Sequence, residues 1–180
     1  MGAAGRTKGV RDRDRDDFEQ FAIARTPELM KAAWLLCGEQ YAAEDLVQET
    51  LARLCSRWPR VRRADNPVAY ARTTLTRLFI DTKRRRSSGE RPVDPVPETP
   101  SRGPDADLRH ALLAALGRLT PKDRAVLVLR FLLDLDVATV SGALDLTDQA
   151  VRSRTSRALV RVRGDLGADF LDLSNEGAAP

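Results

Sequence analysis

Residues 136–163 read DVATVSGALDLTDQAVRSRTSRALVRVR, and this stretch decides the fold expected for the C-terminal part of the chain. Its pattern predicts a short helix at 136–143, a tight turn at 144–146, and a final helix that Thr147 caps and that continues to about Leu166. Apolar residues share one face of the final helix, and arginines with no acidic residue among them occupy the rest. The arginines are Arg152, Arg154, Arg157, Arg161 and Arg163. This is the pattern of a helix-turn-helix, whose second helix can enter a major groove, although a solvated basic face would look the same.

Two further helices are expected just upstream. One lies near 107–116, and the other starts at Thr120, which precedes a proline as a helix-capping residue often does. The run at 126–133 is apolar all round, with Arg130 as its one charged residue. Its length and capped start favour a buried helix, and a buried strand is the alternative.

The segment between Ser87 and Asp107 reads as a linker. It holds five of the ten prolines of the chain, and each proline fixes φ and removes a backbone donor. It also carries five acidic residues against two arginines. We therefore expect an extended, acidic linker that separates two parts of the chain.

The N-terminal part predicts three or four helices. Thr26 followed by a proline resembles a helix start, a second helix is expected from about Ala42 to Trp58, and a third from Asn66 to about Arg86. The fold class is therefore all-α, with a helical bundle and a helix-turn-helix domain. The expected divisions are a disordered tail at 1–16, a bundle at 17–86, a linker at 87–106, a helix-turn-helix domain at 107–168 and a tail at 169–180.

Charge is distributed unevenly over the N-terminal bundle. Lys83, Arg84, Arg85 and Arg86 form a basic run at the end of the third helix, which fits nucleic-acid binding or simply a helix C-terminus that favours cations. In the second helix Asp45, Gln48, Glu49 and Ala52 share one face, because they are spaced three and four residues apart. An acidic face is a poor surface for DNA, so a function for it would be contact with another protein.

Several classes of protein are disfavoured by what the chain contains. The single histidine, the lack of a glycine-rich phosphate loop and the two isolated cysteines predict neither a catalytic site, nor a metal centre, nor a cofactor. The chain has no apolar run of transmembrane length and its charged N-terminus is not a signal peptide. A cytoplasmic protein without membrane insertion is expected.

Taken in order, three segments resemble the extracytoplasmic-function group of RNA polymerase sigma factors, in the sigma-70 family, and look most like its actinobacterial branch. They are AEDLVQETLARL at 43–54, NPVAYARTTLTRLFIDTKRRR at 66–86, and the stretch from Leu119 to Arg163 that ends in VRSRTSRALVRVR. The resemblance implies a non-enzymatic factor that binds core RNA polymerase, recognises the −10 and −35 promoter elements and stabilises the melted strand.

The resemblance also implies a role for each group of residues. It implies that the β′ clamp helices of core polymerase are contacted by Asp45, Leu46, Gln48 and Glu49. It implies that the −10 element is contacted by Arg77, Lys83, Arg84 and Arg85, with Asp81 as a loop residue near a flipped base. It implies that the −35 duplex is contacted by Arg152, Ser153, Arg154, Ser156 and Arg157. An anti-sigma factor is a further partner that the resemblance allows.

Two other functions fit parts of the pattern. A stand-alone helix-turn-helix regulator would use the N-terminal bundle for dimerisation or sensing, and it would bind a specific DNA site by itself. An enzyme that acts on DNA would have only the basic clusters in its favour.

Overall fold

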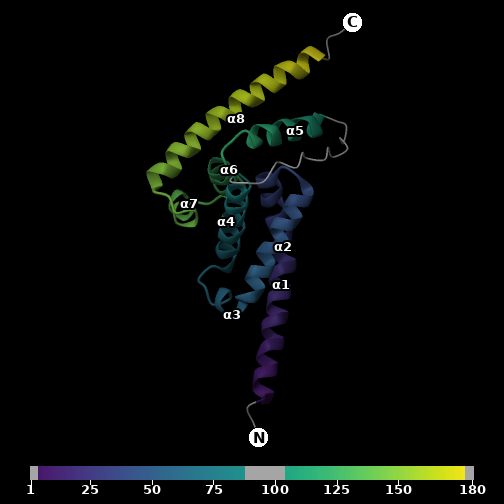
Figure 1. Ribbon diagram of the computed structural model, residues 1–180, viewed down its shortest axis with the longest axis vertical. Helices are drawn as coiled ribbons and strands as arrows, with labels where there is room; N and C mark the ends of the chain where they lie inside the picture. The colour runs from purple at the N-terminus through teal and green to yellow at the C-terminus, as the bar shows by residue number, and fades with distance from the viewer. Residues whose placement is uncertain (1–3, 88–103, 177–180) are drawn as a thin grey trace.

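The computed structural model describes the backbone of residues 4–87 and 104–176, and it is helical over almost all of that length, with no strand in those two ranges. Four helices precede residue 88 and five helical segments follow residue 103 (Figure 1). The expectation of an all-α fold is confirmed. The linker expected at 87–106 lies mostly outside the described residues, and its last three residues already belong to a helix.

Helix α1 (Ala4–Cys37) is longer than the sequence predicts, and two expectations about it are wrong. The tail expected at 1–16 is helical from Ala4, and Asp14 within it pairs with Arg62 at 3.1 Å, as Asp17 just after it does at 3.4 Å. Thr26 does not begin a helix, since Pro27 lies inside α1 and the Thr26 hydroxyl donates to the carbonyl of Ala22 at 2.7 Å.

Helix α1 continues through Pro27 because apolar residues before and after this proline are buried in one core. An interior proline costs a helix about 3 kcal/mol. Phe18 and Phe21 before it, and Leu29 and Leu36 after it, all pack into the same core, so burial on a single straight helix outweighs that cost.

Three helices complete the N-terminal half: α2 (Gln40–Ser56), α3 (Trp58–Val61) and α4 (Pro67–Ser87). Helix α4 begins where expected, because the Asn66 side chain accepts a hydrogen bond from the Ala69 amide at 2.9 Å and Pro67 occupies the first position. Trp58 is buried, and its ring lies 5.4 Å from that of Phe18 and 5.0 Å from that of Phe21. These aromatic contacts fix the middle of α1 against α3.

The C-terminal half contains α5 (Pro104–Gly117), α6 (Pro121–Leu127), a π-helical turn labelled η1 (Val128–Leu132), α7 (Val137–Leu144) and α8 (Asp148–Glu176). The run at 126–133 is helical as far as Leu132, as its length and capped start predict, and the alternative of a strand is wrong. Thr120 and Thr147 each accept a hydrogen bond from a backbone amide three residues ahead, as capping residues do. Helix α8 continues ten residues beyond the predicted Leu166, into the expected tail.

The helix-turn-helix turn depends on Asp145. This residue ends α7 in the left-handed conformation, with φ 53° and ψ 54°. Aspartate tolerates this region better than most residues. The Leu146 amide then donates to the Ser141 carbonyl at 3.0 Å, which closes the turn and sets the angle between α7 and α8.

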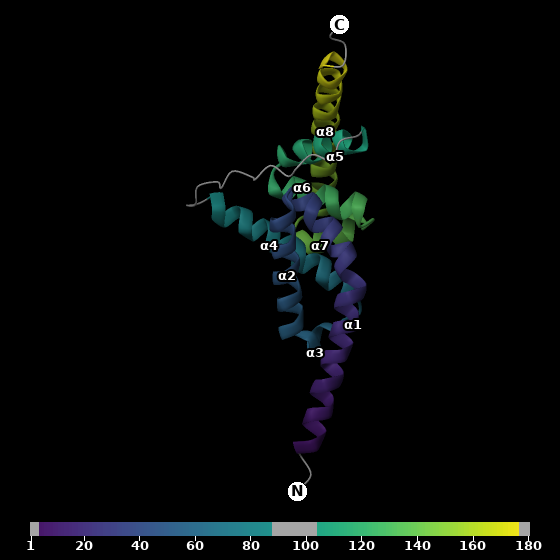
Figure 2. The same cartoon turned by 90° about the vertical axis from the view of Figure 1, so that its right-hand side faces the viewer.

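The two halves pack against each other and share one buried cluster. It joins Leu75 and Leu78 of α4 to Val126 of α6 and Val140 of α7. Two views at right angles show α6 and α7 lying against α4, while the last turns of α4 extend away from the body (Figure 2). The sequence predicts two domains, and the structure adds an extensive contact between them.

Candidate functional site

The acidic face expected on α2 is present and exposed. Asp45, Gln48 and Glu49 are all exposed, and Glu49 forms a 2.6 Å ion pair with Arg53 one turn along the same helix. Leu46 differs from its predicted neighbours, because only 7% of it is exposed and it belongs to the core. It therefore supports the acidic face from below and offers little area for contact with a partner.

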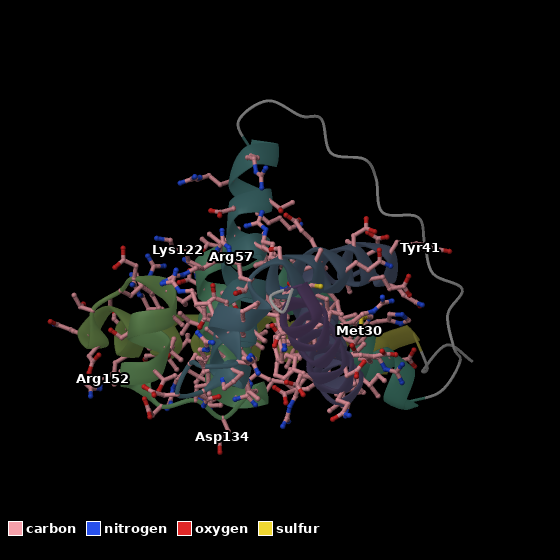
Figure 3. All side chains as sticks on the ribbon, turned by 90° about the horizontal axis from the view of Figure 1, so that it is seen from below. Met30, Tyr41, Arg57, Lys122, Asp134 and Arg152 are labelled. Carbon is pink, nitrogen blue, oxygen red and sulfur yellow. The ribbon has the colours of Figure 1, made fainter. Side chains whose placement is uncertain are left out.

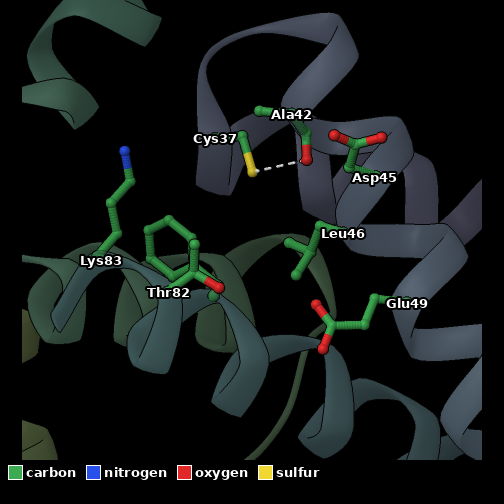
Figure 4. Close-up of a pocket in the computed structure, with 8 residues that line it drawn as sticks. Cys37, Ala42, Asp45, Leu46, Glu49, Thr82 and Lys83 are labelled. Carbon is green, nitrogen blue, oxygen red and sulfur yellow. Dashed lines mark hydrogen bonds between the residues drawn. The ribbon is translucent and has the colours of Figure 1, made fainter. Parts of the chain in front are cut away.

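A cavity of about 220 Å³ lies beside this face, between α2 and α4. Asp45 and Glu49 line it from α2, and Lys83 and Phe79 line it from α4 (Figure 4). Lys83 is thus brought next to the acidic face, although in the sequence it belongs to the basic end of α4. The cavity therefore has carboxylates on its α2 side and an ammonium group on its α4 side.

The predicted −10 residues occupy different environments along α4. Asp81 lies inside the helix and not in a loop, because the pattern of bonds from Pro67 continues to Ser87 without a break. Arg84 lies 4.0 Å from the Asp81 carboxylate, and the Arg85 Nε donates to the Asp81 carbonyl at 3.5 Å. Asp81 therefore sits among the basic residues at the end of α4.

Arg77 in the middle of α4 is bound by the C-terminal half. Its Nε donates to the carbonyl of Ala143 at 2.9 Å, and its Nη2 donates to the carbonyl of Gly142 at 3.3 Å. Both carbonyls lie in the last turn of α7, where a helix leaves acceptors unsatisfied and carries partial negative charge. Arg77 acts here as a cap for α7.

Most of the predicted −35 residues lie on the outer side of α8. Arg152, Ser153, Ser156 and Arg157 are exposed, while Val151, Ala158 and Val162 are buried on the opposite side. Arg152 projects from the edge of the molecule near the start of α8 (Figure 3). The expected division into a buried apolar face and an exposed basic face is therefore present.

Arg154 is the exception in this group, because it turns inward. Its Nη1 lies 2.7 Å from the Asp123 carboxylate in the first turn of α6, and 28% of its side chain is exposed. Burial raises the pKa of Asp123, but hydrogen bonds from Thr120 and Arg154 and the charges of Arg154 and Arg157 outweigh this, so its pKa is lower than usual. Arg154 is placed to hold α8 against α6.

Arg124 is a buried residue that sequence reasoning missed. Only 5% of it is exposed, and its Nε donates to the carbonyl of Leu35 at 2.6 Å. Burial lowers its pKa to about 10, partly opposed by Cys37, so the guanidinium stays charged at neutral pH. No local signal separates it from the other arginines, since its partner lies in α1.

An apolar groove of about 280 Å³ lies between α1, α5, η1 and α8. Leu35, Leu112 and Leu159 line it, and Phe131 and Leu132 of the π-helical turn lie at its side with 58% and 39% of their surfaces exposed. The sequence predicts these last two residues to be part of a buried run. The wider π-helical turn instead directs them outward.

Two findings bear on the classes of protein considered. Among the side chains that the structure describes, at 14–85 and 107–167, no three carboxylate, histidine or cysteine groups come together as a metal site would need. The helices of the same two ranges lack an apolar stretch of the length that a bilayer requires.

Comparison with known families gives two matches in the expected order. Residues 21–89 match the model of Sigma-70 region 2, and residues 109–162 match that of Sigma-70 region 4. The first match covers the second half of α1 and all of α2 to α4, and the second runs from within α5 through α6 and α7 into α8.

Comparison with individual proteins agrees with this. The chain is 32% identical to the RNA polymerase sigma-E factor of Streptomyces coelicolor, over 87% of this chain and 89% of that protein. It is also 32% identical to the ECF RNA polymerase sigma factor SigE of Mycolicibacterium smegmatis, over 81% of this chain and 60% of that protein. The sigma factor RpoE of Bartonella quintana, solved in complex with the anti-sigma factor NepR, has the same fold, with a TM-score of 0.69. The two chains are 24% identical, and the match covers 85% of this chain and 98% of that one.

Proposed function

The chain belongs to the extracytoplasmic-function group of the sigma-70 family. From this membership we propose which of its surfaces bind core polymerase, the −10 strand and the −35 duplex during transcription initiation. A sigma factor binds core RNA polymerase and directs it to specific promoters, and it makes or breaks no covalent bond. The alternatives of a stand-alone regulator and of a DNA-modifying enzyme are therefore set aside. The assignment of individual residues is what we add.

We assign the acidic face of α2 to core polymerase. Asp45, Gln48 and Glu49 are its contact residues, and Leu46 holds them in place from the core. The partner surface, which we take to be the β′ clamp helices, should be basic at this point, because opposite charges steer association and fix its register. Lys83 at the edge of the adjoining cavity sets a boundary to the acidic surface.

We assign the basic part of α4 to the melted −10 strand. Arg84 and Arg85 lie on the turns of α4 that extend away from the body, where a strand can approach (Figure 2). Arg77 and Lys83 would contact neighbouring phosphates, and Asp81 lies among them as the acceptor that discriminates between bases.

We assign the exposed face of α8 to the −35 duplex. Arg152 and Arg157 are the residues for guanine edges or phosphates, and Ser153 and Ser156 are the adjacent hydroxyl groups. Arg154 supports this surface from behind through Asp123 and does not contact DNA in our assignment.

The observation that carries the proposal is the separation of charge. One chain presents an exposed carboxylate face on α2 and an exposed arginine face on α8, and each occurs within the region matched by its family model. A protein that bridges a second protein and DNA needs both surfaces.

The test is transcription with defined components. The purified chain is mixed with sigma-free core polymerase from a related bacterium and fragmented genomic DNA, and the RNA 5′ ends are mapped. We expect discrete starts with shared upstream motifs. The double reversal Asp45→Lys and Glu49→Lys should abolish these starts and core binding together, since it replaces attraction by repulsion.

A matched control is available on the same helix. Glu44 is half-buried and pairs with Gln40 at the edge of the acidic face, one turn before Gln48, so Glu44→Lys makes the same chemical change beside the two reversed carboxylates without touching them. It should retain core binding. Equal loss in both variants, or core binding that survives the double reversal, would contradict the assignment of this surface.

Two further assignments follow from the family. We place the protein in the cytoplasm, where core polymerase is found. We also propose that an anti-sigma factor controls it, because the similar fold of Bartonella quintana was solved with such a partner.

A further inference from the structure

Cys37 supplies a thiol to the cavity between α2 and α4. It is the last residue of α1, it is half-buried, and its Sγ donates a weak hydrogen bond to the carbonyl of Ala42 at 3.6 Å. In the view of Figure 4 the thiol lies between Lys83 on the α4 side and Asp45 on the α2 side. The cavity therefore gives small molecules access to a sulfur that is nucleophilic as the thiolate.

A buried guanidinium lies next to this thiol. Only 5% of Arg124 is exposed, and a Cβ on Gly38, the residue after Cys37, would lie 3.2 Å from the Arg124 Nη2. That nitrogen is buried and has no hydrogen-bond partner among the described residues, which is costly for a charged donor. Burial lowers the pKa of Arg124 and Cys37 opposes that shift, so the two side chains act on each other through their charges. A positive charge beside a cysteine favours the thiolate, which is its reactive form.

The charges that line the cavity match a ligand with both a carboxylate and an ammonium group. The Lys83 ammonium would meet the carboxylate from the α4 side, and the Asp45 and Glu49 carboxylates would meet the ammonium from the α2 side. Asp45 and Glu49 are exposed, so water and salt screen their effect on the thiol more than that of the buried Arg124. The cavity thus combines a nucleophile with a site for an amino-acid-like group.

We propose that Cys37 is a thiolation site, at which the disulfide of an amino-acid-like thiol forms a mixed disulfide beside the acidic face of α2. The Cys37 thiolate attacks one sulfur of the small disulfide, and a new S–S bond forms as the original S–S bond breaks. The other half of the disulfide leaves as a thiolate and takes up a proton. Cys37 is thereby oxidised and the small disulfide is reduced to one molecule of thiol, and an excess of thiol reverses the exchange.

Thiolation at this place would interfere with binding to core polymerase. Asp45 and Glu49 form the wall of the cavity and also belong to the exposed acidic face. An added group would cover the edge of that face with its bulk, and its ammonium would offset the negative charge that attracts a basic partner. This consequence rests on the proposed function, because it requires the acidic face to be the contact with polymerase.

The chemical test uses the full chain, which carries its own reference thiol. Cys55 is exposed on α2 and lies outside the cavity, so the ratio of the Cys37 rate to the Cys55 rate cancels the intrinsic reactivity of each probe. The probes are cystine, which carries both charges, cystamine, which lacks the carboxylate, and dithiodipropionate, which lacks the ammonium. Mass spectrometry of the two cysteine peptides gives both rates. With cystine we expect a higher ratio in the folded chain than in urea, where the surroundings of Cys37 are lost.

Lys83→Gln tests the ammonium side of the cavity. Arg84→Gln is the matched control, because Arg84 is the next residue of α4, is exposed and lies outside the cavity. Lys83→Gln should lower the ratio by about twofold to fivefold more with cystine than with cystamine, which has no carboxylate for Lys83 to bind. Arg84→Gln should leave the ratios unchanged. Arg124→Met should slow the reaction of Cys37 with all three probes, and circular dichroism establishes that the variant is folded.

The functional test follows binding to core polymerase in the Cys55→Ser chain, where Cys37 is the one remaining cysteine. Treatment with cystine should weaken core binding by about tenfold or more, and dithiothreitol should restore it, since the modification is a disulfide. The chain with both Cys37→Ser and Cys55→Ser is the control, and cystine should leave its binding unchanged. Circular dichroism of the thiolated chain separates a blocked surface from loss of the fold.

The outcomes separate the thiolation site from the proposed function. A Cys37 that reacts only after unfolding, or a Lys83→Gln variant that changes the ratios for cystine and cystamine equally, would overturn the site. A thiolated chain that binds core polymerase as tightly as the untreated chain would overturn the effect on binding and leave the proposed function standing. Failure of the untreated chain to bind core polymerase would overturn the proposed function, while the rates at Cys37 would still decide the thiolation site.

Discussion

The ion pair between Arg154 and Asp123 offers the sharpest test of how the helix-turn-helix domain is built. The sequence alone groups Arg154 with the DNA-facing residues of α8, whereas the structure places its guanidinium 2.7 Å from a carboxylate 31 positions earlier. Arg154→Ala should therefore lower stability, and Arg152→Ala on the exposed face should not.

The magnitude follows from burial. The two side chains are 28% and 16% exposed, which lies between a surface pair worth up to about 1 kcal/mol and a buried pair whose disruption costs about 3–5 kcal/mol. A charge-assisted hydrogen bond of this length contributes about 1.5–3 kcal/mol. We expect Arg154→Ala to lower the free energy of unfolding by about 2 kcal/mol, or Tm by roughly 4–8 °C for a chain of this size.

The assay is a double-mutant cycle in urea, with Asp123→Ala, Arg154→Ala and the double variant followed by circular dichroism. The cycle isolates the energy of the pair from the cost of each truncation. We expect a coupling energy of at least about 1 kcal/mol. Effects of the two single variants that simply add, or an Arg154→Ala variant as stable as Arg152→Ala, would refute the inward role of Arg154.

Three further predictions concern binding, capping and pH. Arg152→Ala should weaken binding of the holoenzyme to the −35 duplex by about 1–3 kcal/mol with no change in Tm, and an equal loss on a scrambled duplex would indicate a phosphate contact. Asn66→Ala should lower stability by about 1 kcal/mol in urea unfolding because α4 loses its N-cap, whereas Asn66→Asp should retain most of it. The pKa of Asp123 is lower in the folded chain than its usual value of about 3.9, so its stabilisation is present above that pH and is lost as pH falls through the folded pKa. The stability difference between the unmodified chain and Asp123→Asn, measured from pH 7 to pH 3, should therefore shrink below about pH 4, and a difference that stays constant would contradict this cause.

The sequence was sufficient for features that depend on near neighbours. Asn66, Thr120 and Thr147 were predicted as caps, and each accepts a hydrogen bond from an amide three residues ahead. The turn at Asp145 and the basic outer face of α8 were also predicted correctly, because helical periodicity and left-handed tolerance are local properties.

Local rules failed where packing outweighed them. Thr26 and Pro27 carry the signal of a helix start, yet apolar residues on both sides of this pair pack into one core and α1 continues through it. Leu46, which the family resemblance groups with the polymerase contacts, is buried beneath the acidic face.

The tertiary structure alone decided the roles of the arginines. Arg77, Arg124 and Arg154 are chemically identical in the sequence to the exposed arginines around them. Their partners lie 66, 89 and 31 positions away, in helices that come together only when the chain is packed. A guanidinium binds whichever carbonyl or carboxylate the fold brings within about 3 Å, and periodicity along one helix carries no information about that partner.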